Sequence, residues 1–120
     1  MQGDQSSRDD LERFLSEHDV EFGLVIDDGS HASSHQQISL GSLFRRVEPG
    51  GLYVIEDLHW QPFSETPTTL EILREFVECG QMRSPFLRQD EARYLEGAID
   101  HIEIHRPNDS EFAAIYKKSA

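Results

Sequence analysis

Apolar residues along the chain follow two spacings, one helical and one in short continuous runs. The helical spacing predicts four helices, at 11–18, 35–47, 66–79 and 87–96. The continuous runs at 22–26 and 52–55 predict strands that are covered on both faces, as in a parallel sheet. The segments 99–105 and 111–117 predict an antiparallel hairpin. Since helices alternate with strands before this hairpin, we expect one α/β domain spanning residues 1–120.

The predicted helix boundaries come from Pro, Gly and capping residues. Pro49-Gly50-Gly51 is expected to end the second helix after Val47. Thr66 and Pro67 have the residue types of an N-cap and a first helical position, so the third helix is expected to begin there. Cys79-Gly80 closes it. Its predicted inner face carries Leu70, Leu73, Phe76 and Val77.

Composition excludes several classes of partner. The net charge is −12, and an acidic surface of this size repels both nucleic acid and anionic membranes. The first residues show neither a signal peptide nor an apolar stretch long enough to span a bilayer. Cys79 is the only cysteine, which rules out an internal disulfide and fits a reducing compartment. We therefore expect a cytoplasmic protein that acts on a small molecule.

Both predicted parallel strands end in a pair of acids. Asp27 and Asp28 follow the first strand, and Glu56 and Asp57 follow the second. Because ligands of open α/β sheets bind at the carboxyl ends of parallel strands, these acids are expected to converge. Four crowded carboxylates favour a hard divalent cation such as Mg²⁺. The alternative is that each acid simply begins a solvated loop.

Histidines and aromatic residues lie near the same predicted edge. His31 follows the first acidic pair and could act as a general base, although a loop histidine is often merely exposed. His35 is expected to open the second helix, and His59 to line the rim. The segment 60–63, Trp-Gln-Pro-Phe, could line an acceptor site or close the sheet edge as an apolar plug.

The run from Val25 to His35, together with the run from Pro49 to Asp57, resembles the macrolide-sugar O-methyltransferases of the mycinamicin and macrocin type. A more distant resemblance is to cephalosporin hydroxylase-like proteins. The resemblance covers the chain from Gly3 to Lys118 and is most specific over residues 25–57. It implies part of a class I methyltransferase fold, a Rossmann-like sheet with helices on both faces. The resemblance implies that the chain corresponds to the C-terminal half of this methyltransferase fold.

The same resemblance implies roles for individual residues. The metal ligands would be Asp28, Glu56 and Asp57, and His31 would be the general base. Asp4 and Gln5 would lie near the adenine of S-adenosylmethionine, and Asp27 would help to shape the cofactor pocket. The implied reaction begins when a divalent metal binds an acceptor hydroxyl and lowers its pKa. His31 then removes the proton, and the oxygen attacks the sulfonium methyl group.

The chain departs from the family in one respect, because it contains no strand followed by a glycine-rich cofactor loop. Two interpretations follow. The chain is either part of an active O-methyltransferase or a truncated, non-catalytic domain that folds, self-associates and binds metal. A third possibility is an acid cluster that only stabilises the sheet edge through a metal. Without the first half of the sheet, the strand at 22–26 would be an unpaired apolar edge, so we expect a homo-oligomer.

Overall fold

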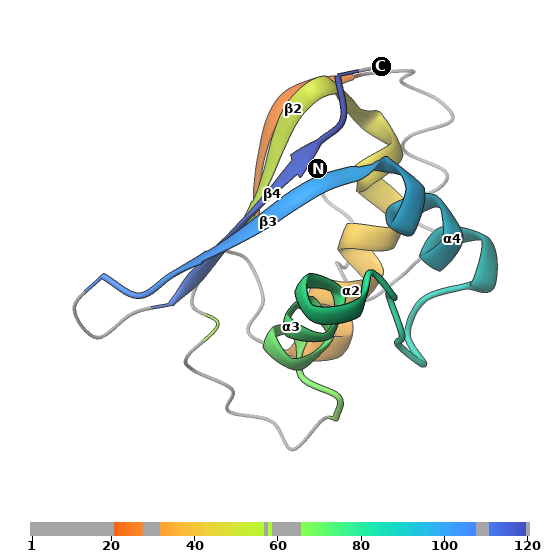
Figure 1. Cartoon of the computed structure of the whole chain (residues 1–120), viewed down its shortest axis with the longest axis vertical. Helices are drawn as coiled ribbons and strands as arrows, with labels where there is room; N and C mark the ends of the chain where they lie inside the picture. The colour runs from red at the N-terminus through yellow and green to blue at the C-terminus, as the bar shows by residue number, and fades with distance from the viewer. Residues whose placement is uncertain (1–20, 28–31, 57, 59–65, 108–110, 120) are drawn as a thin grey trace.

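The structure is a computed structural model that describes residues 21–27, 32–56, 58, 66–107 and 111–119. The sheet has the order β1-β2-β4-β3 (Figure 1). β1 and β2 are parallel, whereas β4 is antiparallel to both of its neighbours. This arrangement confirms the α/β class, with a parallel pair followed by a hairpin. The strands are β1 (Phe22–Asp27), β2 (Val47–Ile55), β3 (Ile99–His105) and β4 (Phe112–Lys117).

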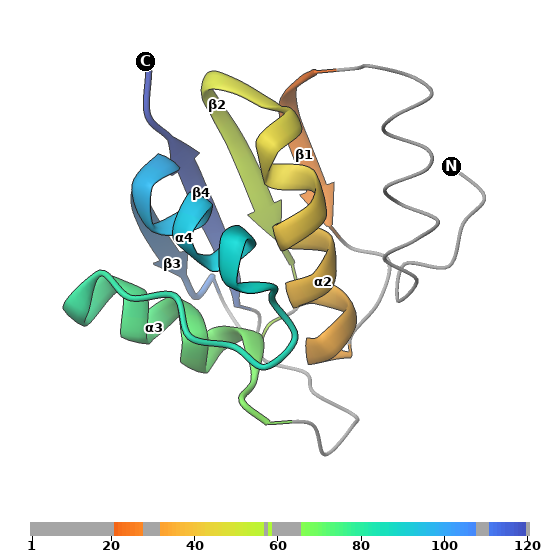
Figure 2. The same ribbon diagram turned by 90° about the vertical axis from the view of Figure 1, so that its right-hand side faces the viewer.

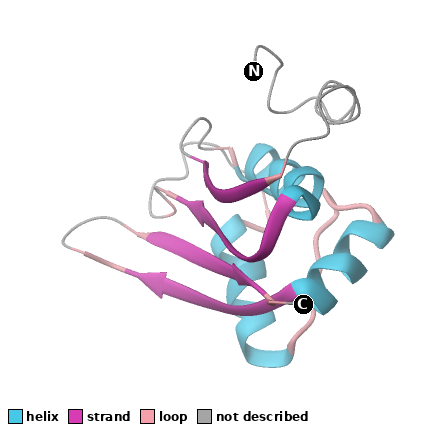
Figure 3. Ribbon diagram, turned by 90° about the horizontal axis from the view of Figure 1, so that it is seen from above, coloured by secondary structure: helices cyan, strands magenta, loops and turns pink. Residues whose placement is uncertain are grey.

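The described helices form one layer on one face of the sheet (Figures 2 and 3). They are α2 (Ser33–Leu43), α3 (Thr69–Cys79) and α4 (Gln89–Ala98), with the short 3₁₀ helix η1 (Phe44–Arg46) directly after α2. A helix was also expected at 11–18, and that segment lies outside the described residues. Within the described part of the chain, no helix combines the length and apolar character needed to cross a membrane.

The strands alternate between a buried face and a more exposed one, because successive side chains point to opposite sides. Tyr53 and Ile115 lie in register on the helix-facing side and are fully buried. Leu24 and Ile26 lie on the other side of β1 and are 54% and 53% exposed. The hydrophobic core consists of Leu40, Phe44, Val47, Tyr53, Ile55, Leu58, Ile72, Leu73, Met82, Leu87, Leu95, Ile99, Ala113 and Ile115.

The end of the second helix differs from the prediction. The helix ends at Leu43, and Val47 begins β2 rather than closing a helix. Gly50 has a φ of 80° and donates its N–H to the carbonyl of Lys118 at 3.0 Å. Residues 48–51 lie between Val47 and Leu52, the two β2 residues between which the register of the β1–β2 pair shifts. Pro and Gly therefore mark an irregularity inside a strand here, which periodicity alone does not distinguish from a helix end.

The third helix also begins later than predicted. Its N-cap is Thr68 rather than Thr66, because Thr68 and Glu71 form a capping box. With this start, Ile72 takes an inward position and is 2% exposed, whereas Val77 is 57% exposed, contrary to the prediction. The predicted end is confirmed, since Gly80 caps the helix with a φ of 76°.

Candidate functional site

The two acid-terminated strands lie side by side, as predicted. Asp27 is the register partner of Ile55 in the parallel β1–β2 pair. The next residue of β2, Glu56, donates its backbone N–H to the carbonyl of Asp27 at 3.1 Å. The C-terminal ends of β1 and β2 therefore lie at the same edge of the sheet, which is the edge where α/β proteins bind ligands.

The predicted site residues fall into two groups. Asp27 is buried, with 6% exposure, and Glu56 is half-buried. The other five, Asp4, Gln5, Asp28, His31 and Asp57, lie outside the described residues. No group of three His, Cys, Asp or Glu side chains able to hold a metal occurs within the described part, which contains Glu56 but neither of the other two predicted ligands. The ligand set and the general base therefore stay predictions.

The N-termini of α2 and α3 are joined by hydrogen bonds close to this edge. The first residue of α3, Thr69, donates its N–H to the hydroxyl of Ser33 in α2 at 3.2 Å, and its own hydroxyl lies 3.4 Å from the Ser33 carbonyl. Gln37 donates its side-chain amide to the carbonyl of Pro67 at 2.9 Å. The N–H of Leu58 bonds to the carbonyl of Glu111 at 2.9 Å. These bonds fix both ends of the connection that follows Glu56.

Tyr53 is a buried polar residue beside Asp27 that the sequence did not indicate as functional. Its side chain is fully buried, and its ring packs 6.3 Å from that of Phe44. Among the described residues its hydroxyl has no hydrogen-bond partner. Burial, and secondly the negative charge of Asp27, raise the pKa of Tyr53 well above its usual value. The only sequence signal is a phenol within the apolar run 52–55.

Two other buried carboxylates have structural partners. Glu91 accepts the backbone N–H of Arg88 at 2.9 Å and so caps α4. Glu111 forms ion pairs with Arg106 and, at 3.5 Å, with Arg74. Neither residue was predicted to be functional, and these contacts account for their burial.

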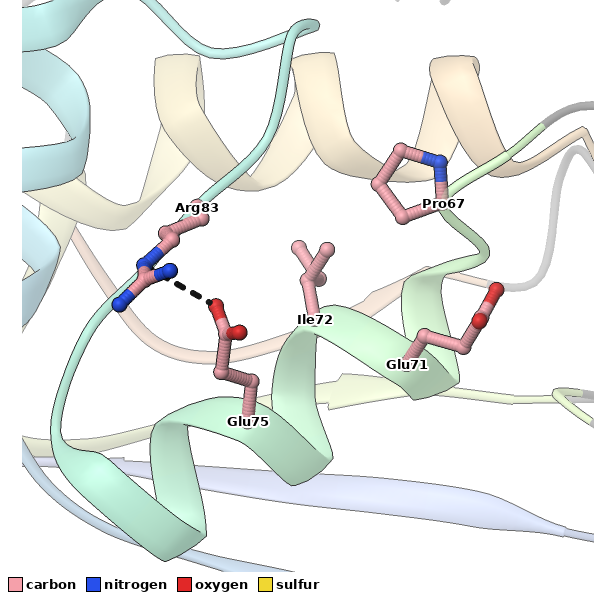
Figure 4. Close-up of a pocket in the computed structure, with 5 residues that line it drawn as sticks. All are labelled: Pro67, Glu71, Ile72, Glu75 and Arg83. Atoms are coloured by element: carbon pink, nitrogen blue, oxygen red, sulfur yellow. Dashed lines mark ion pairs between the residues drawn. The ribbon is translucent and has the colours of Figure 1, made fainter.

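An open pocket of about 370 Å³ lies beside α3, on the helix layer (Figure 4). Its floor is apolar where Ile72 points inward. Its rim carries an ion pair between Arg83 and Glu75, with 3.6 Å between nitrogen and oxygen. The carboxylate of Glu71 is already bonded to the N–H of Thr68 at 2.8 Å, and this bond lowers the pKa of Glu71. The pocket contains none of the predicted site residues.

Comparison with curated proteins identifies sugar O-methyltransferases. No protein-family model matches the sequence. Mycinamicin VI 2''-O-methyltransferase of Micromonospora griseorubida is 37% identical over 91 residues, which are 68% of this chain and 23% of that protein. Demethylmacrocin O-methyltransferase of Streptomyces fradiae is 45% identical over 91 residues, 68% of this chain and 22% of that protein.

Solved structures give the same result. MycE methyltransferase from the mycinamycin biosynthetic pathway, in complex with Mg, SAH and mycinamycin VI, matches 98% of this chain with a TM-score of 0.74 and 30% identity. The match covers 31% of the MycE chain, so the present chain spans less than a third of the length of these relatives. The predicted resemblance is confirmed in sequence and in fold: the chain is related, over part of their length, to the macrolide-sugar O-methyltransferases.

Proposed function

We propose that this chain carries the metal-binding part of a Mg²⁺- and S-adenosylmethionine-dependent O-methyltransferase that acts on a hydroxyl of a small molecule, such as a sugar. The observation that carries the proposal is the bond between the Glu56 N–H and the Asp27 carbonyl, because it joins the ends of the two strands that precede the acids. The related enzymes are named for O-methylation, and MycE contains Mg and SAH in its crystal structure.

The acids fit a hard divalent cation. Asp28, Glu56 and Asp57 offer only carboxylate oxygens, which Mg²⁺ prefers, and two of them follow directly on residues joined by the β1–β2 ladder. When bound, Mg²⁺ acts as a Lewis acid that lowers the pKa of an acceptor hydroxyl. His31, which follows Asp28 by three residues in the sequence, is proposed to accept the hydroxyl proton.

The cofactor contacts are proposed for Asp27, Asp4 and Gln5. Asp27 is rigidly held, since it is buried at the end of β1. A glycine-rich cofactor loop does not occur in these 120 residues. We propose that polypeptide outside this sequence supplies it, because the relatives are more than three times as long as the matched segment. The exposed, unpaired Cys79 is consistent with a cytoplasmic location.

Titration calorimetry with Mg²⁺ tests the proposal. The chain is expected to bind one Mg²⁺, and Asp57→Ala is expected to abolish this binding while circular dichroism shows an unchanged fold. Glu78→Ala is the matched control, because Glu78 is an exposed acid at the end of α3 and should leave the affinity unchanged. Equal affinities in the wild type and in Asp57→Ala would show that the ligand assignment is wrong.

A second candidate function is a truncated, non-catalytic domain that self-associates and binds metal. It is favoured by the exposure of Leu24 and Ile26 on β1, the strand at one end of the described sheet. Apolar edge strands recruit further strands. If the isolated chain binds Mg²⁺ but does not bind S-adenosylmethionine, and forms a dimer in analytical ultracentrifugation, this second function is supported. Binding of both ligands would support the enzyme.

A further inference from the structure

We propose that Tyr53 is a positioning residue of the strand-end site, and that its buried hydroxyl holds the carboxylate of Asp27 through one bridging water. This inference rests on the proposed function, because the purpose of that bond would be to fix the proposed metal ligands. Tyr53 itself is not proposed to touch the metal, the cofactor or the acceptor.

The register of the sheet places the two residues close together. Val25 is the register partner of Tyr53, and Asp27 lies two residues further along β1. Alternate residues of a strand share a face, so Tyr53 and Asp27 both lie on the side covered by the helices. Two residues of a strand span about 7 Å, a distance that a tyrosine side chain leaning along the strand can bridge together with one water.

The environment of the Tyr53 hydroxyl calls for a polar partner. The hydroxyl is fully buried and has no partner among the described residues, and such groups in native proteins are nearly always satisfied by protein or water. The pKa of Tyr53 is raised well above its usual value, first by burial and then by Asp27. The phenol therefore keeps its proton at neutral pH and remains a hydrogen-bond donor, and the carboxylate is near enough to act on it.

Holding Asp27 would also hold two proposed ligands. The Asp27 carbonyl accepts the backbone N–H of Glu56 at 3.1 Å, and Asp28 is the next residue of the chain. The main chain at Glu56 is thus joined to Asp27 by a hydrogen bond, and Asp28 follows Asp27 directly in the sequence. Groups that orient metal ligands from behind typically change metal affinity 10- to 100-fold when they are removed.

The test is Tyr53→Phe, which removes the hydroxyl and keeps the ring that packs on Phe44. We expect the Kd for Mg²⁺, measured by calorimetry, to rise about tenfold. Tyr116→Phe is the matched control: it removes a hydroxyl that lies 3.3 Å from Glu103 on the other face of the same sheet. That variant should bind Mg²⁺ as the wild type does. Unchanged affinity in a folded Tyr53→Phe variant would overturn the inference.

A double-mutant cycle separates this inference from the proposed function. If the wild type binds no Mg²⁺, the proposed function fails, and the bond is then tested by urea unfolding of Tyr53→Phe, Asp27→Asn and the double variant. A water-mediated hydrogen bond between the two residues predicts non-additive effects, with a coupling of about tenfold in the unfolding equilibrium constant. Additive effects would mean that the hydroxyl does not engage Asp27.

Discussion

The two outer strands of the described sheet present opposite surfaces. On the face away from the helices, β1 exposes Leu24 and Ile26, whereas β3 carries His101, Glu103 and His105. Charged residues on an outer strand discourage pairing with another chain, and exposed apolar residues invite it. Among the described strands, β3 is therefore protected by charged residues on its outer face, whereas β1 carries apolar residues there.

The protection of β3 comes from a network of local contacts. Glu103 lies 3.2 Å from His105 and 3.6 Å from His101, and Asp100 lies 2.6 Å from His101. The two imidazole rings stack on aromatic side chains of β4, at 4.3 Å between ring centroids for His101 and Tyr116 and at 4.9 Å for His105 and Phe112. These histidines therefore have structural contacts in the hairpin.

The largest expected effect distinguishes the two faces of the sheet. Ile115→Ala should lower the free energy of unfolding by about 2–5 kcal/mol, because Ile115 is fully buried beneath the helices. Ile26→Ala should change it by only about 0.5 kcal/mol, because that side chain is 53% exposed. Urea denaturation measures both values. Equal losses would mean that the outer face of β1 is covered in solution.

The next effect tests β1 as an association edge. If the chain self-associates there, Ile26→Lys should raise the dimer dissociation constant at least tenfold, because a charge on an edge strand opposes pairing. Sedimentation equilibrium measures this constant. Glu103→Lys changes the opposite outer strand and serves as the control. A stronger effect of Glu103→Lys than of Ile26→Lys would place the interface at β3.

The smallest expected effect is a loss of stability of the β3–β4 hairpin at low pH. The hydrogen bond from His105 is the main cause that lowers the pKa of Glu103 below its usual value of 4.5. A carboxylate whose pKa is lower in the folded state stabilises that state above the unfolded pKa and loses this contribution as the pH falls through the folded value. Amide exchange in β3 and β4 should therefore accelerate slightly below about pH 4.5. Glu103→Gln should remove this additional pH dependence, and an unchanged profile would contradict the assignment.

The sequence predicted β1, β3 and β4 to within one residue of their observed bounds, because each of these strands has a simple pattern. The apolar run at 22–26 became β1, and the hairpin strand at 99–105 was predicted with its observed bounds. The placement of the acids followed from these strands. Since Glu56 follows an apolar run in a parallel pair, its place at the ligand-binding edge needed no tertiary information.

The remaining features depend on tertiary contacts. The start of β2 was missed because Val47 continues the helical spacing, while pairing with Phe22 places it in the sheet. Likewise, the capping box decides that α3 begins after Thr68 rather than after Thr66. Tyr53 was missed because its significance lies in burial beside Asp27, and a one-dimensional pattern does not show which polar atoms will lie next to each other.

The central claim is that Asp28, Glu56 and Asp57 meet around one cation, and anomalous diffraction from crystals grown with Mn²⁺ tests it most directly. Mn²⁺ takes the same oxygen ligands as Mg²⁺ and can be located by its anomalous signal. The account predicts one strong peak beyond the ends of β1 and β2, about 2.0–2.4 Å from oxygens of all three carboxylates. A peak at the Glu71–Glu75 pocket or on β3, or no peak at the strand ends, would contradict it.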